Sequence, residues 1–288
     1  MRAAYLGPEG TNSHEALLAS GAVAEYVGFP TVDAVVAAVQ DGEVDRGLVP
    51  IENSREGAVG ATLDALVFDA PDVGIVGELV HRVSYCLAAA EPFAPDEIRT
   101  VHSHPQATGQ CARFLAEQLP GAAVVAAAST ADAIRAVAEA GELPGAPPHA
   151  AIGTRHAASL YGATVLAGGI EDDPENATRF AWLGRARAGA SELAMAEQTA
   201  APVKTALVFW GGGDRAPGWL VSCLTEFSAR GINLTRIESR PRRVGLGSYM
   251  FFCDLEGPAS NPDIAAAIAG LRQHCETVRV LGSFPVAD

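Results

Sequence analysis

A hydroxyl, a guanidinium and an aromatic ring stand side by side in the stretch ENATRFAWLG, residues 175–184, as Thr178, Arg179 and Phe180. A threonine hydroxyl can donate and accept hydrogen bonds, and an arginine keeps its charge at neutral pH. Neighbouring side chains of a strand point to opposite faces. Thr178 and Arg179 therefore reach one ligand only where the backbone bends or the arginine reaches around. Phe180 returns to the face of Thr178 and packs there. Packing alone is the alternative explanation of the triplet.

Small polar residues recur in the turns that precede predicted helices. They are Thr11 in GPEGT, Asn53 in IENSREG, Ser103 in HSHPQ and Ser129 in STAD. Each one alone is explained by helix capping, for which Ser, Thr and Asn are preferred. The free N–H groups and the dipole of a helix N-terminus also attract anions, and ligands gather at the carboxyl ends of parallel strands. Taken together, these turns predict a site for a dicarboxylate held between two lobes.

One predicted helix carries a second candidate binding residue. Ser103 is predicted to cap this helix, with Pro105 in its first turn. Gln110 follows Ser103 at a distance of about two helical turns and so shares its face. A glutamine in that position can line the same pocket, and a solvated helix residue is the alternative.

Other kinds of catalytic site lack their motifs. The 7 histidines show no metal-ligand spacing, and the 5 cysteines form no C-x-x-C pair, so the sequence predicts no metal site. There is no G-x-S-x-G elbow, no phosphate loop ending in G-K-[ST], and no G-x-G-x-x-G after the first predicted strand.

The composition narrows the class of protein. The chain has 288 residues, of which 49% are hydrophobic and 19% charged, which suits two domains or three small lobes with a sizeable core. A net charge of −14 argues against nucleic acid or an anionic membrane as the main partner. An odd number of cysteines, most of them in apolar runs, favours a reducing compartment. With no leader-like N-terminus and no apolar run of membrane-spanning length, we expect a cytoplasmic protein.

Short apolar runs alternate with predicted helices over residues 1–184, which indicates α/β lobes with parallel sheets and helices on both faces. Residues 74–90 and 165–180 read as two extended crossings, so we expect two lobes with a cleft between them. The predicted boundaries are 1–80 with 167–184 for the first lobe and 81–166 for the second.

A second unit follows an Ala-rich polar segment, residues 185–202, which is predicted to be a linker. Residues 203–285 read as strand, helix, strand, strand, helix and strand. This order is βαββαβ, the ferredoxin-like layout.

Five stretches resemble, in order, the motifs of prephenate dehydratases. They are YLGPEGTNSHEAL, VPIENSREGAVGATLD, VHSHPQATGQCARFL, AAIGTRHAASLYG and NATRFAWLG. Residues 203–285 resemble the ACT regulatory domain of the same family, down to GINLTRIESRP. The resemblance implies a two-lobed catalytic domain like that of periplasmic binding proteins, with a cleft, followed by a ferredoxin-like ACT domain.

The resemblance also implies a reaction: prephenate loses CO2 and water to give phenylpyruvate, without a metal or organic cofactor. Thr178 would be the catalytic residue, donating a proton or hydrogen bond to the departing hydroxyl. Arg179 would supply charge for a substrate carboxylate or polarise its neighbour, and Phe180 would hold Thr178. The substrate-binding positions implied are Asn53, Ser103, Gln110 and Arg179, with Thr11 and Ser129 as further pocket residues.

For the C-terminal unit the resemblance implies phenylalanine as an allosteric effector bound at a dimer interface, in a homodimer or homotetramer. The implied effector-binding residues are Gly218, Leu220, Asn233, Leu234, Glu238 and Ser239. One departure stands out: PGWLVSCL has Trp219 where the family usually has a small residue. Trp219 fills the effector pocket, alters the effector, points into the interface, or faces away; the sequence leaves these four open.

Two alternatives to this function remain open from the sequence. A two-lobed fold with an effector domain also suits a catalytically silent ligand sensor, although a sensor has no need of the threonine in NATRF. Arogenate, which carries an amino group in place of the keto group, is an alternative substrate to prephenate.

Overall fold

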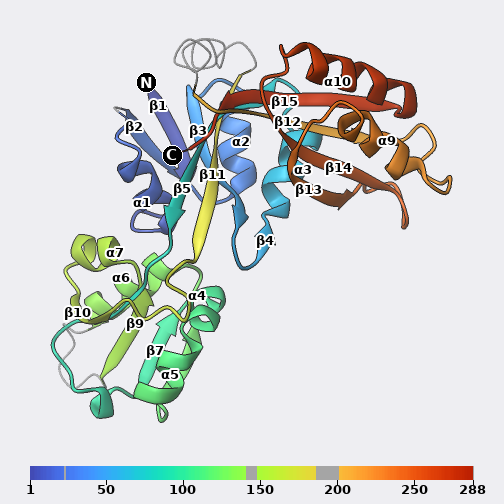
Figure 1. Ribbon diagram of the computed structural model, residues 1–288. Coiled ribbons are helices and arrows are strands. Elements are labelled where there is room, and N and C mark those ends of the chain that lie inside the picture. The colour runs from blue at the N-terminus through green and yellow to red at the C-terminus, as the bar shows by residue number, and fades with distance from the viewer. Residues whose placement is uncertain (23, 141–147, 186–200, 288) are drawn as a thin grey trace.

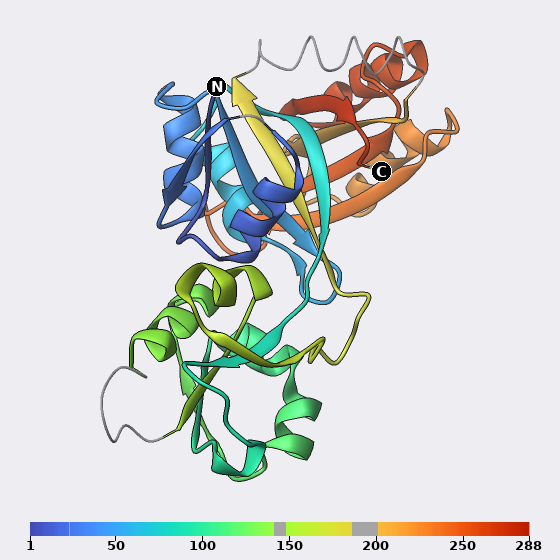
Figure 2. The same cartoon turned by 90° about the vertical axis from the view of Figure 1, so that its left-hand side faces the viewer.

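The structure is a computed structural model that describes residues 1–22, 24–140, 148–185 and 201–287 (Figure 1). Its strands form three sheets. We call the first sheet with α1–α3 the N-terminal lobe, the second with α4–α7 the middle lobe, and the third with α9 and α10 the C-terminal unit. Figures 1 and 2 both place the C-terminal unit beside the N-terminal lobe, with the middle lobe at the opposite end of the molecule.

The N-terminal lobe contains a sheet of order β2-β1-β3-β11-β5, with β4 paired to β3. Its elements are β1 (Arg2–Leu6), α1 (Asn12–Ala19), β2 (Glu25–Phe29), α2 (Val32–Gln40), β3 (Arg46–Asn53), β4 (Gly57–Ala58), α3 (Gly60–Phe68), β5 (Val73–Arg82) and β11 (Ala177–Arg185). The expected parallel pairing holds for β1 with β2 and β3. It is wrong for β11, which pairs antiparallel with both β3 and β5 because it returns from the middle lobe in the reverse direction.

The middle lobe has a sheet of order β10-β6-β9-β7-β8. Its elements are β6 (Cys86–Ala89), a 3₁₀ turn (Pro95–Glu97), β7 (Thr100–Ser103), α4 (Pro105–Gln110), α5 (Ala112–Gln118), β8 (Ala123–Ala126), α6 (Thr130–Ala140), β9 (His149–Gly153), α7 (Arg155–Tyr161) and β10 (Thr164–Gly168). This sheet is also mixed, since β6 runs antiparallel to β9 and β10. The single helix expected after Ser103 is broken at Cys111, whose φ of −119° and ψ of 22° are not helical.

Two passes of the chain join these lobes, as the sequence predicted. The outward pass runs through β5 into β6, and the return runs from β10 into β11. Over their shared length β5 and β11 lie side by side, and they descend together from the first sheet toward the middle lobe (Figure 2). The start of β11 therefore lies where the two lobes meet.

The C-terminal unit has the predicted βαββαβ order and an antiparallel sheet, β13-β14-β12-β15. Its elements are β12 (Val203–Trp210), α9 (Trp219–Ser228), β13 (Leu234–Pro241), β14 (Tyr249–Glu256), α10 (Pro262–His274) and β15 (Thr277–Pro285). The predicted linker, residues 185–202, falls almost entirely outside the described residues. The domain boundaries drawn from the sequence stay a prediction.

One apolar core joins the N-terminal lobe to the C-terminal unit. Along β12, Leu207 and Phe209 face the unit's own helices, whereas Val208 faces the N-terminal lobe, as the two-residue period of a strand requires. Val208, Phe252 and Phe284 are fully or almost fully buried against residues of the lobe. Burying a side chain of this size contributes roughly 1.5–3 kcal/mol, so this contact is a core rather than a surface encounter.

Candidate active site

A cavity of about 380 Å³ lies between the N-terminal and middle lobes. Three helix N-termini meet there, because Thr11 precedes α1, His104 precedes α4 and Ser129 precedes α6, and all three line the cavity. Thr178 and Phe180, from β11, also line the cavity, together with Asn53 from β3. Most of the residues that the sequence singled out on separate motifs thus line one cavity, with Ser103 and Arg179 as the exceptions.

Asn53 and Thr178 are opposite one another on neighbouring strands. The Nδ2 group of Asn53 donates to Oγ1 of Thr178 at 3.0 Å. The orientation of this amide is fixed, because its Oδ1 accepts from the backbone N–H groups of Arg55 and Glu56 at 3.0 and 3.2 Å. The Thr178 oxygen therefore already accepts one hydrogen bond, and its own hydrogen is available to donate.

Asn176, which the sequence analysis did not select, connects this pair to the middle lobe. It is 1% exposed. Its Oδ1 accepts from Asn53 at 3.0 Å, and its Nδ2 donates to Oε1 of Gln110 at 3.0 Å. The two-residue period of a strand is the clue that could have identified it, because this period places positions 176, 178 and 180 on the same face. The three amides form a hydrogen-bonded relay across the cleft.

Gln110 lines the cavity, but Ser103 does not. Ser103 is fully buried at the end of β7, where its hydroxyl donates to the carbonyl of Ile152 at 2.9 Å. The prediction that it caps the helix is wrong, because strand β7 includes Ser103 and the cap falls on His104. The Nδ1 atom of His104 accepts from the N–H of Gln106 at 3.3 Å.

Thr11 and Ser129 cap their helices as the sequence predicted. Oγ1 of Thr11 accepts from the N–H of His14 at 3.4 Å. The hydroxyl of Ser129 accepts from the N–H of Asp132 at 2.9 Å, which is the first half of a capping box. The carboxylate of Asp132 accepts from the Ser129 hydroxyl at 2.7 Å rather than from the backbone N–H that completes the box.

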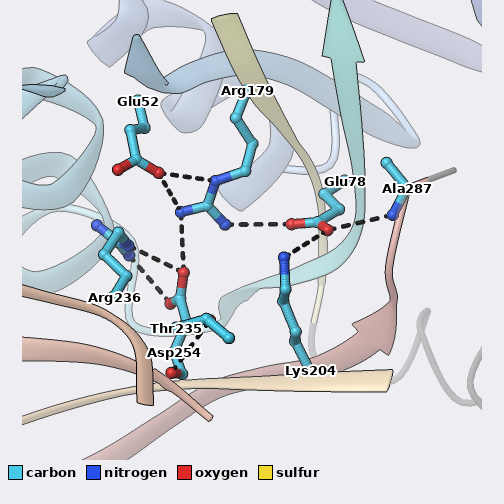
Figure 3. Close-up of polar contacts among 8 residues, drawn as sticks. All are labelled: Glu52, Glu78, Arg179, Lys204, Thr235, Arg236, Asp254 and Ala287. Carbon is cyan, nitrogen blue, oxygen red and sulfur yellow. Dashed lines mark hydrogen bonds and ion pairs between the residues drawn. The ribbon is translucent and has the colours of Figure 1, made fainter. Parts of the chain in front are cut away.

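Arg179 lies outside the cavity lining and points toward three carboxylates instead (Figure 3). Its guanidinium donates to Glu52 at 3.0 Å, to Glu78 at 3.1 Å and to Asp254 of the C-terminal unit at 2.9 Å. Thr178 and Arg179 therefore point to opposite faces of β11, as neighbours in a strand should, and Arg179 does not bend back into the cavity. Phe180 returns to the cavity face and is 1% exposed.

Two further cavity residues carried no clue in the sequence. Tyr85 is 4% exposed, and burial raises its pKa to about 12, so its phenol stays protonated at neutral pH. Its oxygen accepts from Nδ2 of Asn12 at 3.3 Å. Oδ1 of Asn12 is buried without a hydrogen-bond partner in the structure. Both side chains line the cavity and have hydrogen-bonding capacity left for a ligand.

Helix N-termini are the donors that the cavity offers to an anion. Among the described residues, no lysine or arginine lines it. An anion in the cavity would meet the N-termini of α1, α4 and α6, and a helix N-terminus stabilises a nearby negative charge by about 0.3–1 kcal/mol at an exposed site.

Comparison with known proteins identifies this arrangement. The family model for prephenate dehydratase matches residues 3–188, about two thirds of the chain. The prephenate dehydratase of Amycolatopsis methanolica is 41% identical over 290 residues, covering 100% of this chain and 89% of that protein. That of Mycolicibacterium vanbaalenii is 39% identical over 300 residues and covers 99% and 91%. The chain belongs to the prephenate dehydratase family.

Solved structures extend the likeness to the whole chain. The prephenate dehydratase of Arthrobacter aurescens, determined with L-Phe, is 34% identical, has a TM-score of 0.84 and covers 99% of this chain and 90% of its own. A protein described as a novel type of quorum-quenching acylase is 27% identical, with a TM-score of 0.82 and coverage of 99% and 98%. In the described ranges, no helix of this family member is long and apolar enough to span a bilayer.

The six effector positions implied by the resemblance do not all line one pocket within a single copy of this dehydratase-family chain. Gly218 and Leu220 line a shallow pocket of about 190 Å³ at the start of α9. The other four residues, on and just before β13, lie outside its lining. Trp219 packs inward between Phe209 and Phe251 and is 9% exposed, and its Nε1 donates to the carbonyl of His274 at 2.7 Å.

Proposed function

We propose that the cavity converts prephenate to phenylpyruvate, with Thr178 as the donor to the departing hydroxyl. The observation that carries this role is the fixed hydrogen bond from Asn53, which occupies the threonine oxygen and leaves its hydrogen free. As the ring C–O bond breaks, Thr178 donates a hydrogen bond to the departing oxygen, which takes up a proton from solvent and leaves as water. The electron pair of the ring carboxylate bond moves into the ring as CO2 departs, and the ring becomes aromatic.

The two carboxylates of the substrate would be held by helix N-termini. A group bound by N–H donors needs no counter-charge from a side chain, which suits a cavity lined by Thr11, Gln106 and Ser129 rather than by lysine or arginine. Preorganised donors also stabilise the charge that develops on the leaving oxygen, since they need no rearrangement during the reaction.

The likeness to an acylase raises a second chemistry, in which Thr178 would attack an amide as a nucleophile. Such a nucleophile needs a base within hydrogen-bonding reach to remove its proton. In the part of the chain that the structure describes, the side chain hydrogen-bonded to Thr178 is the amide of Asn53, a donor rather than a base. This environment favours Thr178 as a hydrogen-bond donor and therefore supports the dehydratase.

The test is an assay of phenylpyruvate formation from prephenate, run in parallel with arogenate and with an N-acyl homoserine lactone. We expect turnover of prephenate, and its loss in Thr178→Ala without loss of the folded state. Faster turnover of arogenate would reassign the substrate, and release of an acyl group from the lactone alone would replace the proposal with the acylase. No turnover of any of the three would leave the silent sensor.

We further propose that phenylalanine regulates the enzyme through the C-terminal unit, in a homodimer or homotetramer. The related Arthrobacter structure was determined with L-Phe. Since Glu238 and Ser239 do not line the pocket that Gly218 lines within one copy, a second copy that brings β13 of one unit beside α9 of another would complete the effector site. Gel filtration and activity are measured with phenylalanine, tyrosine and tryptophan. No response of activity to any of them would remove the regulatory role.

A further inference from the structure

Two pairs of side chains alternate across the β3–β11 ladder. Thr178 is paired with Asn53, and the next residues along the two strands, Arg179 and Glu52, are paired with each other. The first pair faces the cavity and is joined by a hydrogen bond of 3.0 Å. The second pair faces the opposite way and is joined by an ion pair of 2.9 Å. A shift of either strand that moves one pair must also move the other.

Arg179 is the centre of a network of ion pairs that connects the N-terminal lobe to Asp254 of the C-terminal unit (Figure 3). Its side chain is 12% exposed, and those of Glu78 and Asp254 are 2% and 1% exposed. Asp254, on β14, also receives two hydrogen bonds from Arg236, at 2.9 and 3.1 Å. Burial alone would raise the pKa of Asp254, but Arg236 and Arg179 outweigh it and hold the pKa below its usual value.

The second branch of this network runs through Glu78 on β5. Its carboxylate accepts from Arg179 at 3.1 Å and from Lys204, on β12, at 2.9 Å. The backbone N–H of Ala287 donates to the same carboxylate at 3.1 Å. Three cations, Arg179, Arg236 and Lys204, face three carboxylates, Glu52, Glu78 and Asp254. Removal of Arg179 leaves the buried carboxylates of Glu78 and Asp254 each with one ion-pair partner fewer.

A substrate carboxylate therefore has no access to the guanidinium as it stands. All three nitrogen atoms of Arg179 are already engaged by carboxylates. The arginine next to the candidate catalytic threonine is oriented instead toward the C-terminal unit.

We propose that Arg179 is a positioning residue, which sets the place of Thr178 in the cavity by fixing β11 to Asp254 of the C-terminal unit. The proposal rests on the proposed function, because Thr178 is the group that it positions. Arg179 would also link that unit physically to the reacting centre, because it contacts Asp254 directly and is the next residue in the chain after Thr178. A change in the position of β14 relative to β11 pulls on the guanidinium, and the strand carries the change to the Thr178–Asn53 pair.

Arg179→Lys is the decisive variant, because it retains the charge but loses the forked geometry that binds three carboxylates at once. We expect kcat for prephenate to fall by on the order of tenfold to a hundredfold, since small misplacements of a reacting group have effects of this size. KM should stay within about twofold, because no side chain of the cavity lining has changed. Both constants are referred to the folded fraction, measured by circular dichroism and by thermal unfolding.

Asp254→Asn tests the other end of the contact, and Asp64→Asn is its matched control. Asp64, on α3, also forms an ion pair between the N-terminal lobe and the C-terminal unit, at 2.8 Å from Arg240, but it is not on β11 or its neighbours. We expect Asp254→Asn to lower kcat as Arg179→Lys does, and Asp64→Asn to leave kcat unchanged. In the double variant the two losses should not multiply, because both remove the same link.

Each outcome decides the proposal. A raised KM with an unchanged kcat in Arg179→Lys would show that the arginine binds substrate directly. An unchanged kcat in both single variants, or an equal fall in Asp64→Asn, would reduce the contact to ordinary domain packing, and either result overturns the proposal. If Asp254→Asn does not fold, Arg179→Lys and Glu52→Gln carry the test, since Glu52 is more exposed, at 37%. Wild-type enzyme without turnover would refute the proposed function instead.

Discussion

Nδ2 of Asn53 lies 3.0 Å from Oγ1 of Thr178, and the amide cannot turn around without losing two backbone hydrogen bonds on its other side. The polarity of this contact is thereby set: asparagine donates, threonine accepts, and the threonine hydrogen is directed elsewhere. A hydroxyl held in this way is a donor toward a ligand.

Thr178→Val keeps the shape of the side chain and removes the donor. We expect turnover of prephenate to fall by about 10²–10⁴, the range typical of a lost proton or hydrogen-bond donor at a reacting oxygen. Stability should change by only about 1 kcal/mol, since one hydrogen bond to Asn53 is lost. Steady-state kinetics and urea unfolding measure the two effects.

Asn53→Asp is the complementary change, because a carboxylate can accept from Thr178 but cannot donate to it. The threonine hydrogen would then turn toward the aspartate, and turnover should fall nearly as far as in Thr178→Val. A variant with near-normal kcat would contradict the assigned polarity.

Asn176→Asp breaks the amide relay at its centre. The new side chain can still accept from Asn53, but it has no hydrogen to donate to Gln110. Gln110 then loses the orientation that the relay gives it, and we expect KM for prephenate to rise by about tenfold, equivalent to about 1.4 kcal/mol. Equal KM values in mutant and wild type would show that the relay does not organise the binding site.

The stability of the chain should fall in acid partly through His14. Its Nδ1 accepts from the N–H of Gly10 at 3.0 Å. Burial, and to a smaller extent the neighbouring His156, lowers the pKa of His14 below its usual value of 6.5. The unfolded state therefore binds the proton more readily, so this contribution to stability is present above pH 6.5 and is lost as pH falls below it. His14→Asn retains an acceptor that does not titrate, and its unfolding free energy should depend less on pH as the pH falls below 6.5. A profile parallel to wild type would exclude this role.

The contact between β15 and β5 should not tolerate a side chain at Gly282. A Cβ there would lie 2.0 Å from the carbonyl oxygen of Ile75, and φ is +157°. Gly282→Ala is expected to destabilise the fold by about 1–3 kcal/mol through overpacking. Gly231→Ala is the control, because φ is also positive there, at +67°, and nothing lies within 4 Å of the added atom. Equal melting temperatures for the two variants would show that β15 can move away from β5 at little cost.

Local patterns were enough to predict much of this molecule. The two crossings, the βαββαβ unit and the placement of Thr178 and Phe180 on one face follow from strand periodicity, which depends only on neighbours in the chain. The capping pattern at Ser129 is equally local. These predictions are confirmed because no distant residue competes with them.

The failures have a different origin. Ser103 was assigned to a helix cap, but the strand continues one residue further and the serine bonds to Ile152, 49 residues away. The carboxylates around Arg179 come from three other strands, and Asp254 follows it by 75 residues. Sheet direction also depends on where a returning strand inserts, which no short pattern records. Long-range pairings of this kind are set by the fold as a whole.

The apolar core shared by the N-terminal lobe and the C-terminal unit bears on how such a chain can be altered by gene fusion. A protein cut after residue 185 would expose the lobe's face around Val73 and Ile75, which are now 1% and 4% exposed. A regulatory unit borrowed from a relative would meet a surface shaped for another set of side chains. An exchange of this unit between relatives therefore needs the buried faces on both sides of the contact to be transplanted together.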